Sequence, residues 1–289
     1  MLNDKKFTRT RIAPTPSGYL HLGNALSFAL TAAIARKTGA KIFLRIDDLD
    51  QQRVNLAYVH DIFDTLNFLE IPWDEGPRNV IEYHGEWSQL HRMDTYNKVL
   101  QQLAAQQGVF ACKCSRSQLQ GTSYPGNCIN QSIPLDTPNT AWRLYTNDRP
   151  ITLKTLNNAV TTARLPGSMK NFVVKKKDDH PAYQLASVVD DLYFNVDLII
   201  RGEDLYPSTL AQLFLADVLG KAFNQITFHH HQLLMGSNSQ KLSKSAGATS
   251  IKYLREQGQT SAQIYRTIGS MTGTTLPLQH FDDFLDVLF

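Results

Sequence analysis

Residues 10–24, TRIAPTPSGYLHLGN, contain the clearest fold signal in the chain. This stretch opens with a short β-like run that Pro14 and Pro16 interrupt, and prolines are typical of the end of a strand. Apolar residues then recur at helical spacing over residues 24–38, and Gly39 follows as a helix-ending residue. The sequence therefore predicts a strand, a turn and a helix in succession.

The alternation of strand and helix continues beyond this stretch. Residues 41–47, KIFLRID, are typical of a buried strand followed by an acidic cluster, and residues 55–69 repeat the helical pattern. A strand over 197–201 and a helix over 208–219 resume it later in the chain. Such alternation predicts an α/β fold with a parallel sheet, whose ligands bind at the carboxyl ends of the strands.

The composition changes near residue 108, where Cys, Ser, Asn, Pro and Thr become frequent and only short β-like pieces occur, at 151–156 and 171–176. Helical patterns return at 251–256 and 261–270. We expect three regions: an α/β core over 1–107 and 181–245, an inserted subdomain over 108–180, and a short helical C-terminal region over 246–289.

The composition of the 289 residues is that of a soluble globular protein, with 42% hydrophobic and 19% charged residues. The net charge of +3 is compatible with an RNA partner without indicating one. The N-terminus lacks the apolar segment of a secretory signal, and no apolar run is long enough for a membrane span. The three cysteines argue against a disulfide framework, so a cytoplasmic protein is expected.

The segment HLGN (residues 21–24) falls where the predicted strand passes into the predicted helix. Backbone N–H groups at a helix start favour phosphate, so a triphosphate is the ligand expected there. His21 could donate a hydrogen bond to a phosphate oxygen, and Gly23 leaves room for an adenine or ribose against the backbone. The alternative is a Pro/Gly turn with an incidental histidine.

A second candidate for phosphate handling is QKLSKS, residues 240–245. Lys241 and Lys244 on a loop could neutralise charge that develops on departing pyrophosphate. A solvated basic turn is the alternative.

The two motifs together resemble the HIGH and KMSKS elements of the class I aminoacyl-tRNA synthetases. Three further segments match the wording of the glutamyl subgroup: LRIDDLD from Leu44, YQLASVVDD from Tyr183, and IRGEDL from Ile200. The resemblance covers nearly all of residues 7–245. It implies a Rossmann-like catalytic core that joins an amino acid to AMP with release of pyrophosphate, and then passes the aminoacyl group to RNA.

The resemblance also implies roles for individual residues. The glutamate pocket would comprise Arg11, Ile12, Ala13, Pro14, Thr15, Asp47, Tyr183 and Arg201. ATP, carrying magnesium, would contact His21, Gly23, Asn24 and Lys244, with His21, Lys241 and Lys244 acting in catalysis.

The glutamate pocket departs from the family pattern at one important position. Arg11 and Arg201 suit a carboxylate because a guanidinium donates in a planar fork, although either could instead form a surface salt bridge. The family has Glu where this chain has Asp47, and the shorter side chain puts the choice of amino acid in question. The sequence predicts that Asp47→Glu leaves activation intact or improves it. Thr15 replaces the family's Ser and keeps the hydroxyl.

Three thiols and a phenol lie within seventeen residues, at Cys112, Cys114, Tyr124 and Cys128. Zinc prefers four such ligands in a tetrahedron, but three cysteines lack a fourth ligand, so buried free thiols are the alternative. The spacing resembles the C-x-C…Y-x-x-x-C zinc site of the glutamyl-Q tRNA(Asp) synthetases, where the tyrosine completes the shell. That resemblance implies a structural zinc ion.

The resemblance also bears on the RNA step. Only 44 residues follow Ser245 in this sequence, so we expect no anticodon-binding domain. The glutamyl-Q tRNA(Asp) synthetases attach glutamate to queuosine in the anticodon of tRNA(Asp), and a monomer that binds ATP, L-glutamate and this tRNA is expected here. The alternatives are a minimal glutamyl-tRNA synthetase acting on an acceptor end, and a non-catalytic paralogue that binds an amino acid or nucleotide.

Two other segments carry an open choice. The lysines at 175–177 could contact phosphates, but a solvated hairpin beside Asp178 and Asp179 is the simpler interpretation. His229 and His231 would share a face of a strand and could bind metal, although a partly packed strand is favoured.

Overall fold

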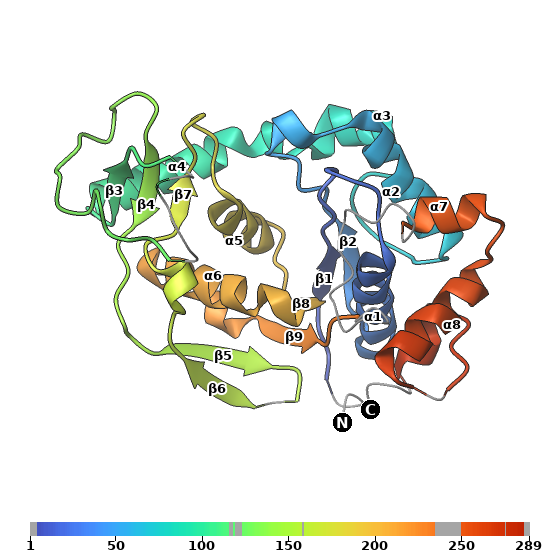
Figure 1. The fold of residues 1–289 in the computed structure, drawn as a ribbon. Coiled ribbons are helices and arrows are strands. Elements are labelled where there is room, and N and C mark those ends of the chain that lie inside the picture. Colours follow the sequence, from blue (N-terminus) through green and yellow to red (C-terminus); the bar gives the residue numbers. More distant parts are fainter. Residues whose placement is uncertain are drawn as a thin grey trace. The chain divides into compact units, whose positions relative to one another are not determined.

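The computed structural model describes residues 5–115, 118, 123–157, 159–234, 250–274 and 276–285. The chain forms two compact units (Figure 1). Unit 1 comprises Met1–His91, Val196–Asp204 and His229–Phe289, and unit 2 comprises Arg92–Asn195 and Leu205–Phe228. The division expected from the sequence, into an α/β core, an inserted subdomain and a C-terminal region, stays a prediction.

The helices and strands of unit 1 are β1 (Arg9–Ile12), α1 (Leu22–Thr38), β2 (Lys41–Leu44), α2 (Leu56–Phe68), α3 (Val80–Glu82), β8 (Leu198–Gly202), α7 (Ile251–Glu256) and α8 (Ser261–Thr272). Those of unit 2 are α4 (Met93–Ala105), β3 (Val109–Cys112), β4 (Ala141–Leu144), β5 (Ile151–Thr155), β6 (Val160–Ala163), β7 (Val173–Lys175), α5 (Tyr183–Tyr193) and α6 (Tyr206–Val218). Strand β9 (Thr227–His231) begins in unit 2 and ends in unit 1.

Unit 1 is built on parallel strands. β1 pairs with β2 in parallel, with Ile12 opposite Leu44. β8 runs beside β1, because the N–H of Asp197 donates to the carbonyl of Arg9 at 3.0 Å. This arrangement confirms the α/β fold with parallel strands predicted from the sequence.

Helix α1 follows β1 as predicted. It ends at Gly39, whose φ of 78° is in the left-handed region that glycine adopts most readily. Most of its residues are buried, including Ala29, Ala33 and Ile34, because it packs on the strands and is covered by α8 and the short helix Phe281–Phe284 (Figure 1).

In its described residues, unit 2 combines antiparallel strands with the helices α4, α5 and α6. β3, β4 and β7 form an antiparallel sheet in that order, and β5 pairs with β6 in a hairpin and with β9 in parallel. Helix α5 packs against α4, α6 and β7. The sequence predicted strands at the positions of β5 and β7 and a helix at the position of α6. The motif YQLASVVDD, which forms most of α5, was recognised from the sequence. Helix α4 and strands β3, β4 and β6 were not predicted.

No helix within the described ranges combines the length and the apolar character needed to cross a lipid bilayer.

Candidate active site

The segment HLGN forms the start of helix α1. His21 is the N-cap, and its Nδ1 accepts a hydrogen bond from the N–H of Gly23 at 3.1 Å. The Asn24 side chain in turn accepts from the N–H of His21 at 3.1 Å. A neutral imidazole that accepts at Nδ1 carries its proton on Nε2, so Nε2 is the atom able to donate to a phosphate.

Gly23 has a second role that the sequence did not indicate. A Cβ at this position would lie 3.0 Å from Cε1 of His21, closer than the capping ring permits without a shift. Glycine therefore allows the histidine to cap the helix. Of the four residues predicted to contact ATP, three come together at the capped start of α1: His21, Gly23 and Asn24.

The loop before His21 is held in place by two other helices of unit 1. The N–H of Ile251, at the start of α7, donates to the carbonyl of Leu20 at 2.8 Å. The N–H of Leu20 faces the carboxylate of Asp61 on α2 at 3.5 Å, and Arg255 lies 3.6 Å from the same carboxylate. Burial raises the pKa of Asp61 despite these partners.

Three charged residues predicted for the glutamate pocket lie near the carboxyl ends of strands: Arg11 in β1, Asp47 just after β2, and Arg201 in β8. We call Arg11, Asp47 and Arg201 the strand-end cluster. All three are buried. Arg11 donates to the carbonyl of Ile200 at 3.4 Å, and the N–H of Asp47 donates to the carbonyl of Pro14 at 2.9 Å.

The remaining pocket candidates differ in their settings. Ile12 is 1% exposed and belongs to the core, whereas Thr15 is exposed. Ala13 is partly exposed between them. Tyr183 begins α5 in unit 2 with an exposed ring. Lys241 and Lys244 lie outside the described residues.

A residue that sequence analysis missed contacts the strand-end cluster directly. Arg45 donates from Nε to Oδ1 of Asp47 at 2.6 Å and from Nη2 to Oδ2 at 3.2 Å. The signal was their spacing, because residues two apart on an extended chain point to the same face.

The neighbouring Asp48 has a different task. Its buried carboxylate accepts from the hydroxyl of Tyr83 at 2.6 Å, from the hydroxyl of Ser88, and from the N–H of Gln89 at 2.8 Å. Burial and the bond to Asp48 raise the pKa of Tyr83. Asp48 therefore anchors the segment that follows α3, and its motif neighbour Asp47 belongs to the strand-end cluster.

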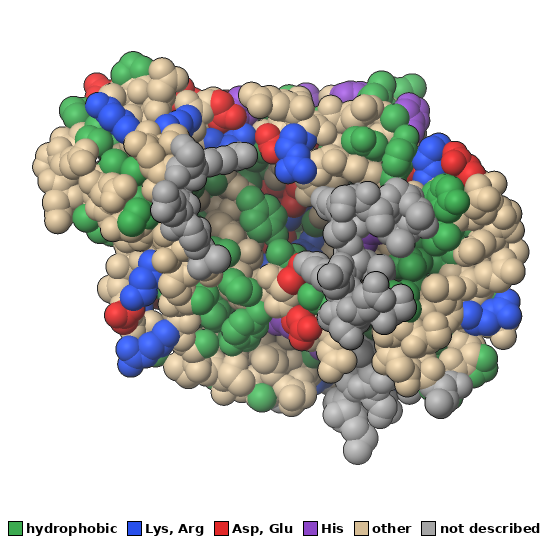
Figure 2. Space-filling model, in the orientation of Figure 1, with side chains coloured by type: hydrophobic (Ala, Val, Ile, Leu, Met, Phe, Trp, Pro, Cys, Tyr) green, Lys and Arg blue, Asp and Glu red, His purple; other side chains and the backbone are tan. Residues whose placement is uncertain are grey.

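The lysines at 175–177 form part of a hairpin. Lys175 pairs with Asp179 at 2.6 Å, and Lys176 pairs with Asp178 at 3.0 Å. Lys177 donates to the carbonyl of Lys113 at 2.7 Å. On the face drawn in Figure 2, the described Lys and Arg side chains are scattered in small groups. These contacts favour the hairpin interpretation.

The three histidines lie on β9 as a partly packed strand. Nε2 of buried His231 lies 2.6 Å from the hydroxyl of Ser27, and its Nδ1 lies 2.9 Å from the carbonyl of Gln232. Burial lowers the pKa of His229 to about 4 and, with the nearby Arg201, that of His230 to about 3. The structure thus favours packing for this segment.

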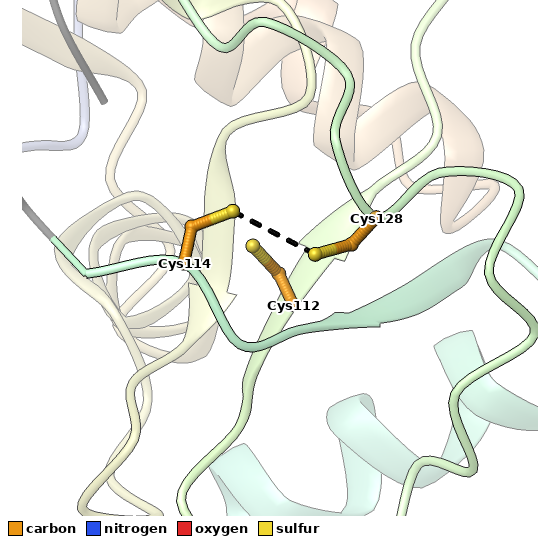
Figure 3. A group of neighbouring side chains, drawn as sticks. All are labelled: Cys112, Cys114 and Cys128. Atoms are coloured by element: carbon orange, nitrogen blue, oxygen red, sulfur yellow. Dashed lines mark hydrogen bonds between the residues drawn. The ribbon is translucent and has the colours of Figure 1, made fainter. Parts of the chain in front are cut away.

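The cysteine cluster is the group of metal-ligating side chains that comes together within the described ranges (Figure 3). The sulfur atoms of Cys112, Cys114 and Cys128 lie within 4.8 Å of one another. The hydroxyl of Tyr124 lies 3.7 Å from the Cys112 sulfur and accepts from the N–H of Cys128 at 2.8 Å. All four residues with an implied role as ligands are therefore neighbours.

The surroundings of the thiols affect their ionisation. Burial opposes ionisation of Cys112, but hydrogen bonds from Arg143, the backbone and Tyr124 outweigh it and lower the pKa. Burial and the neighbouring thiols raise the pKa of Cys114 to about 11. The Arg143 guanidinium also stacks 4.1 Å above the Tyr124 ring. Three neighbouring sulfurs fit the ligand preferences of a tetrahedral zinc ion, and the phenol oxygen of Tyr124 is the atom beside them that would complete the shell.

Comparison with known proteins assigns the family. The profile described as "tRNA synthetases class I (E and Q), catalytic domain" matches residues 8–127 and 156–281. A glutamyl-Q tRNA(Asp) synthetase of Symbiobacterium thermophilum is 33% identical over 281 residues, covering 91% of this chain and 86% of the relative. One of Nitratidesulfovibrio vulgaris is 32% identical over 282 residues, covering 92% and 86%.

Longer relatives match as well. A glutamate–tRNA ligase of Syntrophus aciditrophicus is 32% identical over 268 residues, which is 86% of this chain but 54% of the relative, so the chain spans about half the length of that ligase. The glutamate–tRNA synthetase structure of Elizabethkingia anophelis has the same fold, with a TM-score of 0.74 at 21% identity over 96% of this chain and 67% of that one. The chain belongs to the class I aminoacyl-tRNA synthetases of the E and Q group, a family of ligases, and is related within it to the glutamyl-Q tRNA(Asp) synthetases.

Proposed function

We propose that this protein activates glutamate with ATP in the absence of tRNA and transfers the glutamyl group to queuosine in the anticodon of tRNA(Asp). The observation that carries the activation step is the strand-end cluster, which lies in the same unit as the capped start of helix α1. The two relatives named glutamyl-Q tRNA(Asp) synthetase, matched over 86% of their length, support the choice of RNA.

The charges of glutamate correspond to those of the strand-end cluster. Arg11 and Arg201 would bind its carboxylates, because a guanidinium donates two parallel hydrogen bonds to a carboxylate. The carboxylate of Asp47 would accept hydrogen bonds from the α-ammonium of glutamate. For Tyr183, the first residue of α5, a role in glutamate binding is proposed from the family motif alone.

ATP would bind at the start of α1. The helix end and Nε2 of His21 favour a phosphate group there. Lys241 and Lys244 would neutralise the departing pyrophosphate, and magnesium bound to ATP would shield its phosphates. Gly23 and Asn24 complete this assignment.

The chemistry needs no protein nucleophile. An oxygen of the α-carboxylate attacks the α-phosphorus of ATP, the bond to pyrophosphate breaks, and glutamyl adenylate forms. A hydroxyl of queuosine would then attack the activated carbonyl, the bond to AMP breaks, and the hydroxyl proton leaves with the departing phosphate or passes to water. The protein supplies positioning and electrostatic stabilisation.

We also propose that Cys112, Cys114, Tyr124 and Cys128 hold a zinc ion. Four protein ligands leave no open position for substrate, so the ion would stabilise the loop rather than take part in the reaction. The expected division into a catalytic core over 1–107 and 181–245 with this insertion over 108–180 is part of the same proposal.

A minimal glutamyl-tRNA synthetase is the second candidate, because relatives named glutamate–tRNA ligase match 86% of this chain. It shares the activation step and differs in the RNA that receives glutamate.

The activation step is tested by ATP–pyrophosphate exchange without tRNA, using glutamate, glutamine and aspartate in turn. Exchange that depends on glutamate is the expected result. Arg201→Gln should abolish most of it, whereas Arg149→Gln, on an ion pair with the exposed Asp217, should leave it intact. Absence of exchange with all three amino acids would exclude the proposed activity.

A further inference from the structure

The Arg45–Asp47 pair fixes the position of a carboxylate in the strand-end cluster. Both oxygens of Asp47 accept from one guanidinium, at 2.6 and 3.2 Å. The side chains are 2% and 10% exposed. A carboxylate held at both oxygens by a planar donor is fixed in rotation as well as in place.

The backbone at both residues is fixed too. The N–H of Arg45 donates to the carbonyl of Ile12 at 2.9 Å, and the N–H of Asp47 donates to that of Pro14 at 2.9 Å. A longer side chain at residue 47 could not withdraw along the strand, so its carboxylate would overshoot the guanidinium by roughly one carbon–carbon bond. The pair is therefore matched to Asp at this position.

Resting on the proposed function, we propose that Arg45 is a positioning residue that sets the Asp47 carboxylate for the α-ammonium of the amino acid. The guanidinium holds both oxygens of this carboxylate in one orientation, and the ammonium would meet the carboxylate in that orientation. Arg45 acts through Asp47 and does not itself touch the substrate.

The adjacent Asp48 provides an internal comparison. Its carboxylate also lies in a buried hydrogen-bond network, but its partners Tyr83, Ser88 and Gln89 anchor a loop. A purely structural Arg45 should behave like these partners when it is altered. A positioning Arg45 should change recognition of the amino group alone.

The test uses Arg45→Lys in the full chain, with Tyr83→Phe as the matched control. Lysine keeps the charge but cannot donate in a planar fork to both oxygens. In the exchange assay, Arg45→Lys should raise KM for glutamate by about tenfold or more and change KM for ATP less than about twofold. Inhibition by glutarate, a dicarboxylate without an amino group, should keep its wild-type inhibition constant.

The outcomes separate the two proposals. An unchanged KM for glutamate in Arg45→Lys overturns the positioning role while the proposed function stands. So does a parallel rise in KM for glutamate, in KM for ATP and in the inhibition constant of glutarate, if Tyr83→Phe shows the same rise. If wild type uses another amino acid, the same comparison with that amino acid tests Arg45. Wild-type protein that binds no amino acid in calorimetry overturns both.

Should Arg45→Lys fail to fold, Asp47→Asn provides the second variant. It keeps the size of the side chain and removes the charge that the ammonium needs. Its KM for glutamate should rise while glutarate inhibition is retained, and loss of both to the same extent would contradict the assignment.

Discussion

Arg92 and Asp190 form a bidentate ion pair in the interior of unit 2. Nε and Nη2 of Arg92 donate to the two carboxylate oxygens at 2.8 and 3.0 Å, and the hydroxyl of Tyr96 donates to the same carboxylate at 2.7 Å. Asp190 is fully buried. The pair ties helix α5, which begins with Tyr183, to the first turn of α4. The first aspartate of the motif YQLASVVDD is thus a structural anchor.

Asp190→Asn should destabilise the protein strongly. Removing one partner of a buried ion pair leaves the other charge uncompensated, at a cost of about 3–5 kcal/mol. Urea unfolding measures the effect. Asp217→Asn removes the partner of Arg149 in an exposed pair and should cost less than about 1 kcal/mol. Equal losses in the two variants would contradict the anchoring role.

Stability should fall as the pH is lowered from about 7 to about 4. Burial lowers the pKa of His229 from 6.5 to about 4 and that of His230 from 6.5 to about 3. In that range the unfolded chain binds protons that the folded chain does not, so each histidine contributes a slope of up to about 1.4 kcal/mol per pH unit.

Unfolding in urea at several pH values measures this slope. His229→Gln should reduce it, and His60→Gln, on an exposed position of α2, should leave it unchanged. A wild-type slope in His229→Gln would show that this side chain is not buried in its neutral form.

The purified protein should contain one zinc ion per chain by elemental analysis. Cys128→Ser should remove most of the zinc, because a thiolate is lost from the group of three. Tyr124→Phe tests the fourth ligand and should lower the affinity for zinc by about 10-fold or more, as a competition with a chelator would measure. Full zinc affinity in Tyr124→Phe would assign the fourth position to another ligand.

Asp47→Glu separates the inference drawn from the sequence from the one drawn from the structure. The family pattern alone predicts intact or improved activation. The bidentate contact with Arg45 predicts instead that KM for glutamate rises, because the longer side chain no longer fits that guanidinium. Pyrophosphate exchange at varied glutamate decides between them.

The sequence predicted the features that depend on residues close together in the chain. The periodicity of residues 24–38 and the stop at Gly39 gave helix α1, and the cysteine spacing gave a cluster whose sulfurs lie together. Helix α4 was missed although Tyr96, Leu100 and Leu103 recur at helical spacing and are buried. The polar residues of α4 that lie between these apolar positions obscured the helical pattern.

Pairings between distant segments left no such signal. β3 pairs with β4 although they are far apart in the sequence, with Val109 opposite Leu144, and no spacing rule indicates that partner. The contact of Arg45 with Asp47 was missed for another reason. The family motif had assigned Asp47 to the substrate, so its neighbour two residues earlier was not considered as a partner.

Transfer of labelled glutamate to RNA measures which acceptor the protein uses. Three acceptors are compared under identical conditions: tRNA(Asp) containing queuosine, the same tRNA without queuosine, and tRNA(Glu). We expect label on the first alone, recovered in the anticodon fragment after nuclease digestion. Label on tRNA(Glu) but not on queuosine-containing tRNA(Asp) would contradict the proposed choice of RNA.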